Sequence, residues 1–291
     1  MRVLVTGGSG FTGRRVLPRL LAAGHDVSAL ARSDGAAAVV VTLGARPLMG
    51  DLDDRAGLRD AFRDAKADVL VNLASLGFGH TPAIVEAARQ GSIDRAVFVS
   101  TTAIFTTLAA PSKRVRVEAE RLVQTSGLEW TIVRPTMIYG APDDRNMWRL
   151  LRALRRTPVF PLPGGGRRLQ QPVHVEDLAD AIVASAATTA AIGNAYELAG
   201  PEALTLRRIV EEAGAAVGRS PRLVAVPLGP AIAGVRLYER VSRHPRIRAE
   251  QLERLAEDKA FDIAAARREL NFAPRLFATG IAEEAALLRA A

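Results

Sequence analysis

Cysteine is absent from the sequence, aromatic residues make up only 5% of it, and its apolar runs are short. Without cysteine the chain can form neither disulfides nor a catalytic thiol centre, as is typical of cytoplasmic proteins. No apolar run approaches the roughly 20 residues that a membrane-spanning helix needs. The chain begins with a strand pattern, MRVLVTGG, where a secretory signal would have a charged and then an apolar segment. We therefore predict a cytoplasmic protein with no membrane partner.

The net charge of +8, from 39 Lys and Arg against 31 Asp and Glu, raises the question of a nucleic-acid partner. The basic residues are mostly arginines spread through alanine-rich stretches, and no compact run mixes them with aromatic residues. We therefore expect no nucleic-acid partner. No group of His, Asp and Glu has the spacing of a metal site, so no metal is predicted.

The first half of the 291-residue chain alternates strand patterns with helical patterns. This alternation implies right-handed crossovers and a parallel sheet covered on both faces. Apolar runs such as DVLVNL and AVFVS fit strands that are buried on both sides. The predicted strands are 2–6, 26–31, 45–49, 68–73, 95–100 and 130–134, and the predicted helices are 12–23, 54–65, 81–90 and 113–126.

The alternation breaks after residue 135. We expect loops over 140–146 and 158–166, helices over 147–156 and 175–187, a strand near 169–173, and later strands over 195–198 and 223–226. The predicted fold class is α/β, a doubly wound parallel Rossmann sheet with a smaller C-terminal substrate lobe. Residues 1–135 form the Rossmann domain in this prediction. Residues 136–291 form mainly the lobe, with the strand and helix near 169–187 returning to the Rossmann core.

The strongest motif is TGGSGFTG over residues 6–13, directly after a predicted strand and at the start of a predicted helix. Gly7 can adopt the backbone angles of a tight turn, Gly10 lets the backbone approach a pyrophosphate, and Gly13 lets the helix pack closely on the strand. The helix N-terminus adds N–H donors and the positive end of its dipole. The sequence therefore predicts a dinucleotide site. Its candidate phosphate-side residues are Gly7, Gly10, Phe11, Thr12 and Gly13.

The Gly-x-x-Gly-x-x-Gly spacing resembles that of the extended short-chain dehydrogenase/reductase family, the NAD(P)-dependent epimerases and dehydratases, rather than that of ordinary dehydrogenases. GDLDD (50–54) resembles the family's adenine-contacting turn, VNLAS (71–75) its fourth strand, VRPTMIYG (133–140) its segment beside the nicotinamide, and VHVEDLADAI (173–182) its late strand–helix junction. The resemblance implies further cofactor contacts from Asp51, Leu52, Leu73, Ala74, Ser75 and Pro135. Asp51 could instead cap a helix, although Asp53 or Asp54 is better placed for that.

The second strand, within GHDVSALARS (24–33), bears on the choice of cofactor. Where the family's NAD-dependent members have an Asp for the ribose 2′-hydroxyl, this sequence has Ala31, followed by Arg32 and Ser33. A guanidinium can pair with a 2′-phosphate, and Ser33 can add a hydrogen bond. These residues favour NADP over NAD. The alternative for Arg32 is an ordinary solvated charge.

The family's catalytic Tyr-x-x-x-Lys pair is not matched here. Alignment on VEAERLV (117–123) puts Ser112 at the Tyr position and Arg116 at the Lys position. Serine is shorter and far less acidic than a phenol, so the family's acid–base step is not available to this pair. The resemblance makes Thr101 the counterpart of the catalytic Ser or Thr, and Ser112, Arg116 and Tyr139 are further candidates. Thr101 could equally be an ordinary strand end, and packing under a loop is the more common role for a residue placed like Tyr139.

Two functions are compatible with these residues. One is an NADP-dependent oxidoreductase or epimerase-like enzyme for a small carbonyl, alcohol or sugar-like substrate, with protons handled by Thr101, water or the substrate. The other is a non-catalytic NADP-binding redox sensor or an assembly or scaffold protein. The substrate-lobe motifs favour the first, and the missing Tyr-Lys pair favours the second. By analogy alone, the family resemblance also suggests a homodimer through the fourth and fifth helices.

Overall fold

The computed structural model describes residues 1–108, 110–144, 146–242 and 249–290. Within them, the central sheet has seven parallel strands in the order β3-β2-β1-β4-β5-β6-β11. The strand order reverses between β1 and β4, which is where a doubly wound sheet opens its ligand crevice. The strands are β1 (Arg2–Thr6), β2 (Asp26–Ala31), β3 (Arg46–Met49), β4 (Val69–Asn72), β5 (Arg95–Val99), β6 (Glu129–Pro135) and β11 (Ala195–Leu198).

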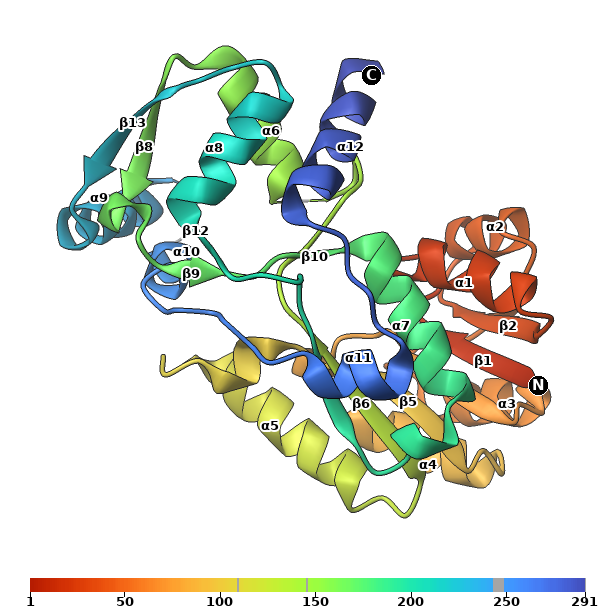
Figure 1. Cartoon of the computed structure of the whole chain (residues 1–291). Helices are drawn as coiled ribbons and strands as arrows, with labels where there is room; N and C mark the ends of the chain where they lie inside the picture. Colours follow the sequence, from red (N-terminus) through yellow and green to blue (C-terminus); the bar gives the residue numbers. More distant parts are fainter. Residues whose placement is uncertain (109, 145, 243–248, 291) are drawn as a thin grey trace.

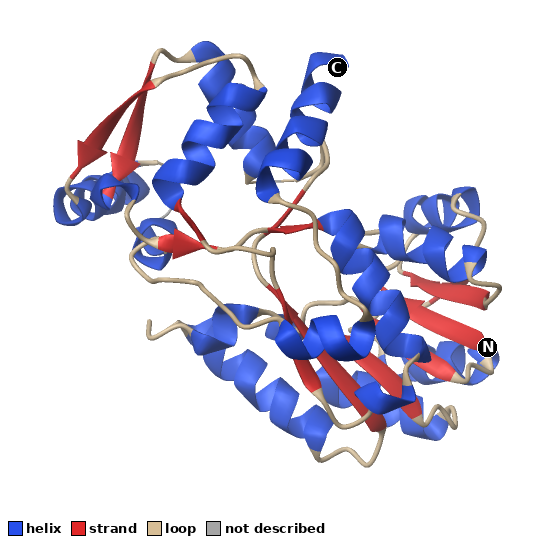
Figure 2. Cartoon of the chain, in the orientation of Figure 1, coloured by secondary structure: helices blue, strands red, loops and turns tan. Residues whose placement is uncertain are grey.

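Both faces of this sheet are buried under helices (Figure 2). Side chains alternate along β1, so Val3 and Val5 enter one core cluster and Leu4 enters the other. The Val3 side is covered by α1 (Gly13–Ala22), α2 (Asp34–Thr42), α7 (Val175–Ala187) and α11 (Ala264–Leu270). The Leu4 side is covered by α3 (Arg55–Ala65), α4 (Thr81–Gln90) and α5 (Pro111–Gln124). The predicted doubly wound Rossmann fold is confirmed.

A smaller lobe packs beside the carboxyl ends of the strands (Figure 1). Its core is formed mainly by apolar side chains of three helices, including Leu151, Ile209 and Ile281. The lobe contains α6 (Met147–Arg156), β8 (Val159–Pro163), α8 (Leu206–Ala216), β13 (Arg222–Val226), α9 (Leu228–Val241), α10 (Ala249–Arg254) and α12 (Phe277–Ala290). Two short strand pairs link it to the sheet: β7 (Ile138–Tyr139) with β10 (Val173–His174), and β9 (Leu169–Gln170) with β12 (Leu204–Thr205).

Three local features differ from the sequence-based expectations. Helix α2 was not predicted; its apolar residues are not confined to one face, and only Val40 is buried. The loop expected over 158–166 is wrong for its first part, because β8 pairs with β13 although it contains Pro161 and Pro163. Each strand of a two-stranded sheet is an edge, where proline is tolerated. The single strand expected near 169–173 is two short strands, β9 and β10, with different partners.

Several segments of the second half return to the Rossmann core. Helix α7 packs beside α1, and its Leu178 and Ile182 join the same cluster as Val3. The short strand β10, which precedes α7, pairs with β7 rather than with the central sheet. The buried carboxylate of Asp177 on α7 accepts hydrogen bonds from the backbone and guanidinium of Arg275, which lies just before α12.

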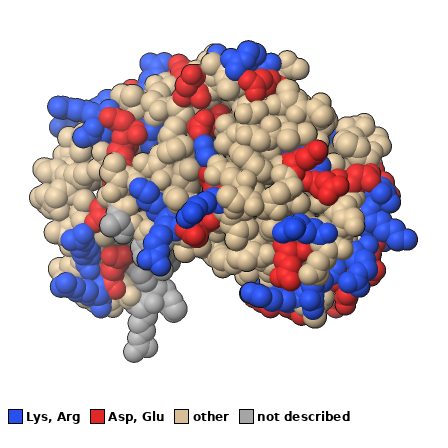
Figure 3. Space-filling view, turned by 90° about the horizontal axis from the view of Figure 1, so that it is seen from below, with Lys and Arg blue, Asp and Glu red and all other residues tan. Residues whose placement is uncertain are grey.

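The surface carries mixed charge. On the face seen in Figure 3, Lys and Arg side chains lie beside Asp and Glu side chains, without a large area of one sign. Among the described helices, none is both long enough and apolar enough to cross a bilayer.

Candidate functional site

In the glycine-rich turn between β1 and α1, the start of the helix lies in close contact with the backbone of the turn. Gly7 has a φ of +72°, and its carbonyl accepts the N–H of Gly10 at 3.1 Å. A Cβ on Gly13 would lie 2.4 Å from the carbonyl oxygens of Gly7 and Gly8, so no larger residue fits there without moving the turn. The requirement for glycine at this position is therefore steric.

The start of α1 presents free N–H groups. Thr12 occupies the N-cap position but makes no side-chain capping bond. The backbone N–H groups of Phe11, Thr12 and Gly13 donate no hydrogen bond within the described part of the chain. Three unused donors at the positive end of a helix dipole fit the pyrophosphate of a dinucleotide.

The end of β4 lies directly against this turn. A Cβ on Gly7 would lie 3.2 Å from the backbone N of Ala74, and Asn72 accepts a hydrogen bond from Thr6 at 2.6 Å. Asn72 also donates to the carbonyl of Ala74, which fixes the chain where it leaves the sheet. The predicted cofactor residues Leu73, Ala74 and Ser75 are thus half-buried beside the turn.

The residues expected to select the cofactor follow β2 and β3. Arg32 is exposed directly after β2 and has no hydrogen-bond or ion-pair partner among the described residues. Ser33 caps α2 by accepting the N–H of Ala36 at 3.3 Å, so its hydroxyl oxygen already has one structural partner. Because β1 and β2 are adjacent and parallel, the glycine turn and Arg32 leave the sheet at the same edge.

The predicted adenine-side residues lie at this edge too. The N–H of Gly50 donates to the carbonyl of Ala31, which holds the turn after β3 against the end of β2. Asp51 is exposed, while Leu52 is half-buried and packs against the core beneath. Asp54, not Asp51, caps α3 through the N–H of Ala56, so the helix-cap expectation for Asp53 or Asp54 is confirmed at Asp54.

A cavity of about 800 Å³ opens between the carboxyl ends of β5 and β6 and the smaller lobe. Thr101 lies in its wall, two residues after β5, and its hydroxyl oxygen accepts the N–H of Ala103 at 3.2 Å. The hydroxyl hydrogen of Thr101 is not used by this bond. Pro135 ends β6, and Thr136, which follows it, also lines the cavity. The apolar part of the wall consists of Ala103, Phe105, Met137, Leu255, Ala256 and Phe261.

The far wall of the cavity is a segment of residues 255–261, called here the strap. Its Glu257 accepts hydrogen bonds from the hydroxyl of Thr106 and from the N–H and hydroxyl of Thr107. The rings of Phe105 and Phe261 lie 5.9 Å apart, so the same two segments also meet through apolar contact. The strap therefore ties the smaller lobe to the loop that follows Thr101.

The other candidate catalytic residues lie in two different places. On α5 the guanidinium of Arg116 donates to the hydroxyl of Ser112 at 3.1 Å, so the expected shared helix face is present. Neither residue lines the cavity that contains Thr101. Tyr139 is 1% exposed, packs against Phe277 and His174, and does not line this cavity either. Burial raises the pKa of its phenol, so proton release from Tyr139 is disfavoured.

His174 joins the two lobes. Its Nδ1 accepts the N–H of Glu176 at the start of α7, and its ring packs edge-on against Tyr139. A Cβ on Gly140, whose φ is +118°, would lie 2.2 Å from His174 Nε2. Burial and the nearby Arg275 guanidinium lower the pKa of His174, so the ring is neutral and acts in packing and capping.

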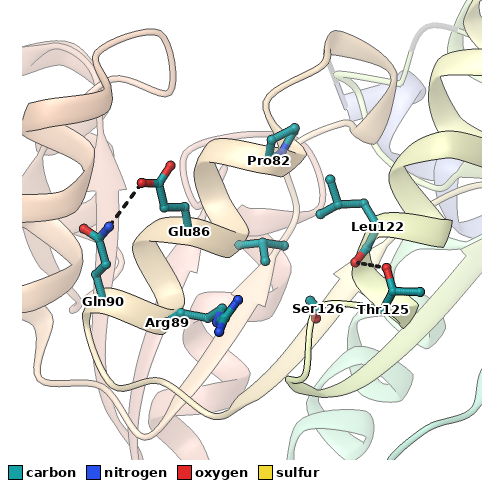
Figure 4. Close-up of a pocket in the computed structure, with 8 residues that line it drawn as sticks. Pro82, Glu86, Arg89, Gln90, Leu122, Thr125 and Ser126 are labelled. Atoms are coloured by element: carbon teal, nitrogen blue, oxygen red, sulfur yellow. Dashed lines mark hydrogen bonds between the residues drawn. The ribbon is translucent and has the colours of Figure 1, made fainter.

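A second hollow lies between α4 and α5, away from the glycine turn. Figure 4 shows side chains of the two helices facing each other across it, with Gln90 donating to Glu86. It contains no residue of the predicted cofactor site; its lining is Pro82, Val85, Glu86, Arg89, Gln90, Leu122, Thr125 and Ser126. The homodimer expected through these helices stays a prediction. No group of three or more potential metal ligands occurs among the residues that the structure describes.

Residues 7–189, which include the glycine turn and most of the sheet, match a protein-family model described as NAD(P)H-binding. The chain belongs to the NAD(P)H-binding family. The NAD(P)H-binding segment covers more than half of the chain, so the NAD(P)-binding part of the expected resemblance is confirmed.

Individual relatives show how far this similarity extends. A 4-hydroxy-2-methyl-3-oxo-4-farnesyl-3,4-dihydroquinoline-1-oxide ketoreductase from Stigmatella aurantiaca is 32% identical, covering 95% of this chain and 93% of that protein. A mitochondrial NADH dehydrogenase (ubiquinone) 1 alpha subcomplex subunit 9 from Arabidopsis thaliana is 29% identical, covering 77% of this chain and 60% of that protein. UDP-glucose 4-epimerase from Thermus thermophilus, solved in complex with NAD, has a TM-score of 0.75 at 21% identity and 100% coverage of both chains. The last likeness is one of fold.

Sequence reasoning did not find the strap. Glu257, Lys259 and Phe261 line the same cavity as Thr101 although they lie more than 150 residues further along the chain. The segment EDKAF (257–261) has no periodic pattern and is typical of an ordinary polar connection between helices. Only their contacts with residues 105–107 place them at the site.

Proposed function

We propose that this protein is an NADP(H)-dependent oxidoreductase that reduces a ketone with an apolar ring or chain. The observation that carries the proposal is the cavity beside Thr101, which has an apolar wall and lies at the carboxyl edge of an NAD(P)H-binding sheet. The Stigmatella relative, which is named as a ketoreductase, supports the same reaction class. A cytoplasmic location stays a prediction.

The residues present fit a dinucleotide. The free N–H groups of Phe11, Thr12 and Gly13 would hold the pyrophosphate, and the exposed Arg32 would pair with the 2′-phosphate. When bound, the reduced nicotinamide supplies a hydride. Thr101 would orient the ketone by donating its hydroxyl hydrogen to the carbonyl oxygen, since its lone pair already accepts the N–H of Ala103.

The proposal is tested first by binding and then by turnover. Purified, nucleotide-stripped protein is titrated with NADPH and NADH; we expect NADH to bind at least about tenfold more weakly, a difference of roughly 1.4 kcal/mol. Oxidation of NADPH is then followed with acetophenone, benzoin and ethyl acetoacetate. We expect turnover that T101V reduces by about 10-fold or more and T101S, which keeps the hydroxyl, largely retains. Equal turnover in T101V and wild type would remove Thr101 from the reaction.

The alternative is a non-catalytic NADP-binding sensor or assembly protein. The absence of a tyrosine from α5 and the similarity to a mitochondrial NADH dehydrogenase (ubiquinone) subunit favour it. The same experiment separates the two, because tight NADPH binding without turnover on any ketone would favour the alternative.

A further inference from the structure

Lys259 is a half-buried lysine in the strap, and it lines the cavity that also contains Thr101. The backbone on both sides of it is fixed. The N–H of Lys259 donates to the carbonyl of Leu169 at 2.9 Å, and the N–H of Phe261 donates to the Gln171 side chain at 2.7 Å. The position of the lysine in the cavity is therefore set by main-chain contacts.

The ammonium group of Lys259 has no hydrogen-bond or ion-pair partner among the described residues. The charged groups around it are Glu257, Asp258 and Arg254, all in or beside the strap. Glu257 is occupied by Thr106 and Thr107, and Asp258 is paired with Arg168 and the N–H of Leu169. Both carboxylates thus have structural partners other than the lysine.

Burial lowers the pKa of Lys259. The negative charge of Glu257 opposes this shift, and the positive charge of Arg254 adds to it. A lysine that releases its proton more readily than an exposed one is better suited to general acid catalysis than an ordinary lysine. The cavity is also lined by Arg254 and by the hydroxyls of Thr101, Thr106 and Thr107. Arginine side chains do not act as proton donors in proteins, and aliphatic hydroxyls are too weakly acidic to be the final proton source.

We propose that Lys259 is the general acid of the ketone reduction, acting on the carbonyl oxygen that Thr101 orients; this inference rests on the proposed function. The carbonyl carbon gains a C–H bond by taking a hydride from the reduced nicotinamide, and the electron pair of the C=O π bond moves onto the oxygen. The Nζ–H bond of Lys259 then breaks as the O–H bond forms. The products are the alcohol and the oxidised nicotinamide, and the neutral amine regains its proton from water.

The test compares wild type with K259M and K259R. Methionine keeps much of the length without a proton, and arginine keeps the charge but does not release a proton. We expect kcat to fall at least about 100-fold in both variants, while the Kd for NADPH stays within about twofold. K66M, at an exposed lysine far from the cavity, is the control and should match wild type.

A second experiment measures the titration of the Lys259 side chain by NMR. The chain contains only three lysines, Lys66, Lys113 and Lys259, so ¹³C-dimethylation of the amines gives few NMR signals. The signals of Lys66 and Lys259 are assigned by their absence from K66M and K259M. We expect Lys259 to titrate at lower pH than an ordinary exposed lysine, because burial lowers its pKa. We also expect wild-type kcat to decrease at high pH with a midpoint near that of Lys259, because the ammonium form is required.

The outcomes separate the two proposals. If wild type reduces a ketone and K259M or K259R keeps kcat within about threefold, Lys259 is not the acid and the proposed function stands. The same conclusion follows if the alkaline decrease of kcat survives unchanged in K259M. If wild type reduces none of the ketones, the proposed function fails, and the role of Lys259 fails with it.

Discussion

Glu284 on α12 is a carboxyl group with no exposed surface, and it makes the stability of this protein depend on pH. Its Oε2 accepts the N–H of Gly140 at 3.0 Å, whereas its Oε1 has no hydrogen-bond partner within the described structure. Burial raises the pKa of Glu284 to about 8, and the nearby negative charge of Asp144 adds to the shift. The group is therefore mostly protonated in the folded protein at neutral pH.

The sign of the effect follows from the two pKa values. The folded state holds this proton up to about pH 8, but the unfolded chain releases it near 4.5. Stability is therefore greatest below pH 4.5 as far as this group is concerned, and it decreases as the pH rises toward 8. With about 1.36 kcal/mol per pH unit between the two pKa values, the free energy of unfolding should fall by about 3 kcal/mol between pH 4.5 and 7, and by about 4 kcal/mol up to pH 8.

The variant E284Q isolates this contribution, because glutamine keeps an oxygen for the N–H of Gly140 and does not ionise. We expect urea unfolding, followed by circular dichroism from pH 5 to 8.5, to show a smaller loss of stability in E284Q than in wild type. The difference should grow with pH to several kcal/mol. E283Q is the control, since Glu283 is half exposed and its pairing with Arg275 should change stability by about 1 kcal/mol or less. Parallel pH curves for wild type and E284Q would refute the reasoning.

Three further predictions concern the cofactor site and the contact between the lobes. In G13A the new methyl group would collide with the carbonyls of the glycine turn, so we expect NADPH binding in a fluorescence titration to weaken at least about tenfold. R32A should raise the Kd for NADPH about tenfold and leave the Kd for NADH nearly unchanged, because only NADPH carries the 2′-phosphate. D177N should lower the free energy of unfolding by about 2–3 kcal/mol in urea, because it weakens the bonds from Arg275.

Each of these has an outcome that contradicts it. G35A is the control for the turn, because a Cβ there meets no atom within 4 Å, and equal NADPH binding in G13A and G35A would contradict the steric argument. An equal loss of NADPH and NADH binding in R32A would mean that Arg32 does not bind the 2′-phosphate. Unchanged stability in D177N would mean that the contact between α7 and Arg275 adds little to folding.

The elements around the cofactor turn could be predicted because their determinants are neighbours in the sequence. The glycines of TGGSGFTG predict a turn between strand and helix, and Gly7 and Gly13 occupy the strained and crowded positions that require glycine. Asp54 caps α3 for an equally local reason. Prediction failed where the local signal was weak or misleading: α2 buries only Val40, and the prolines of β8 resemble those of a loop.

The parallel sheet, the glycine turn and the edge at which we expect a dinucleotide to bind could be inferred from the sequence alone, because strand and helix patterns and backbone requirements act over a few residues. The residues that line the cavity together with Thr101 are known only from the tertiary structure. Glu257 and Lys259 reach that cavity through hydrogen bonds with Thr106, Thr107 and Leu169, all far away along the chain. No local sequence pattern predicts these contacts, because they depend on how the smaller lobe packs over the carboxyl ends of β5 and β6.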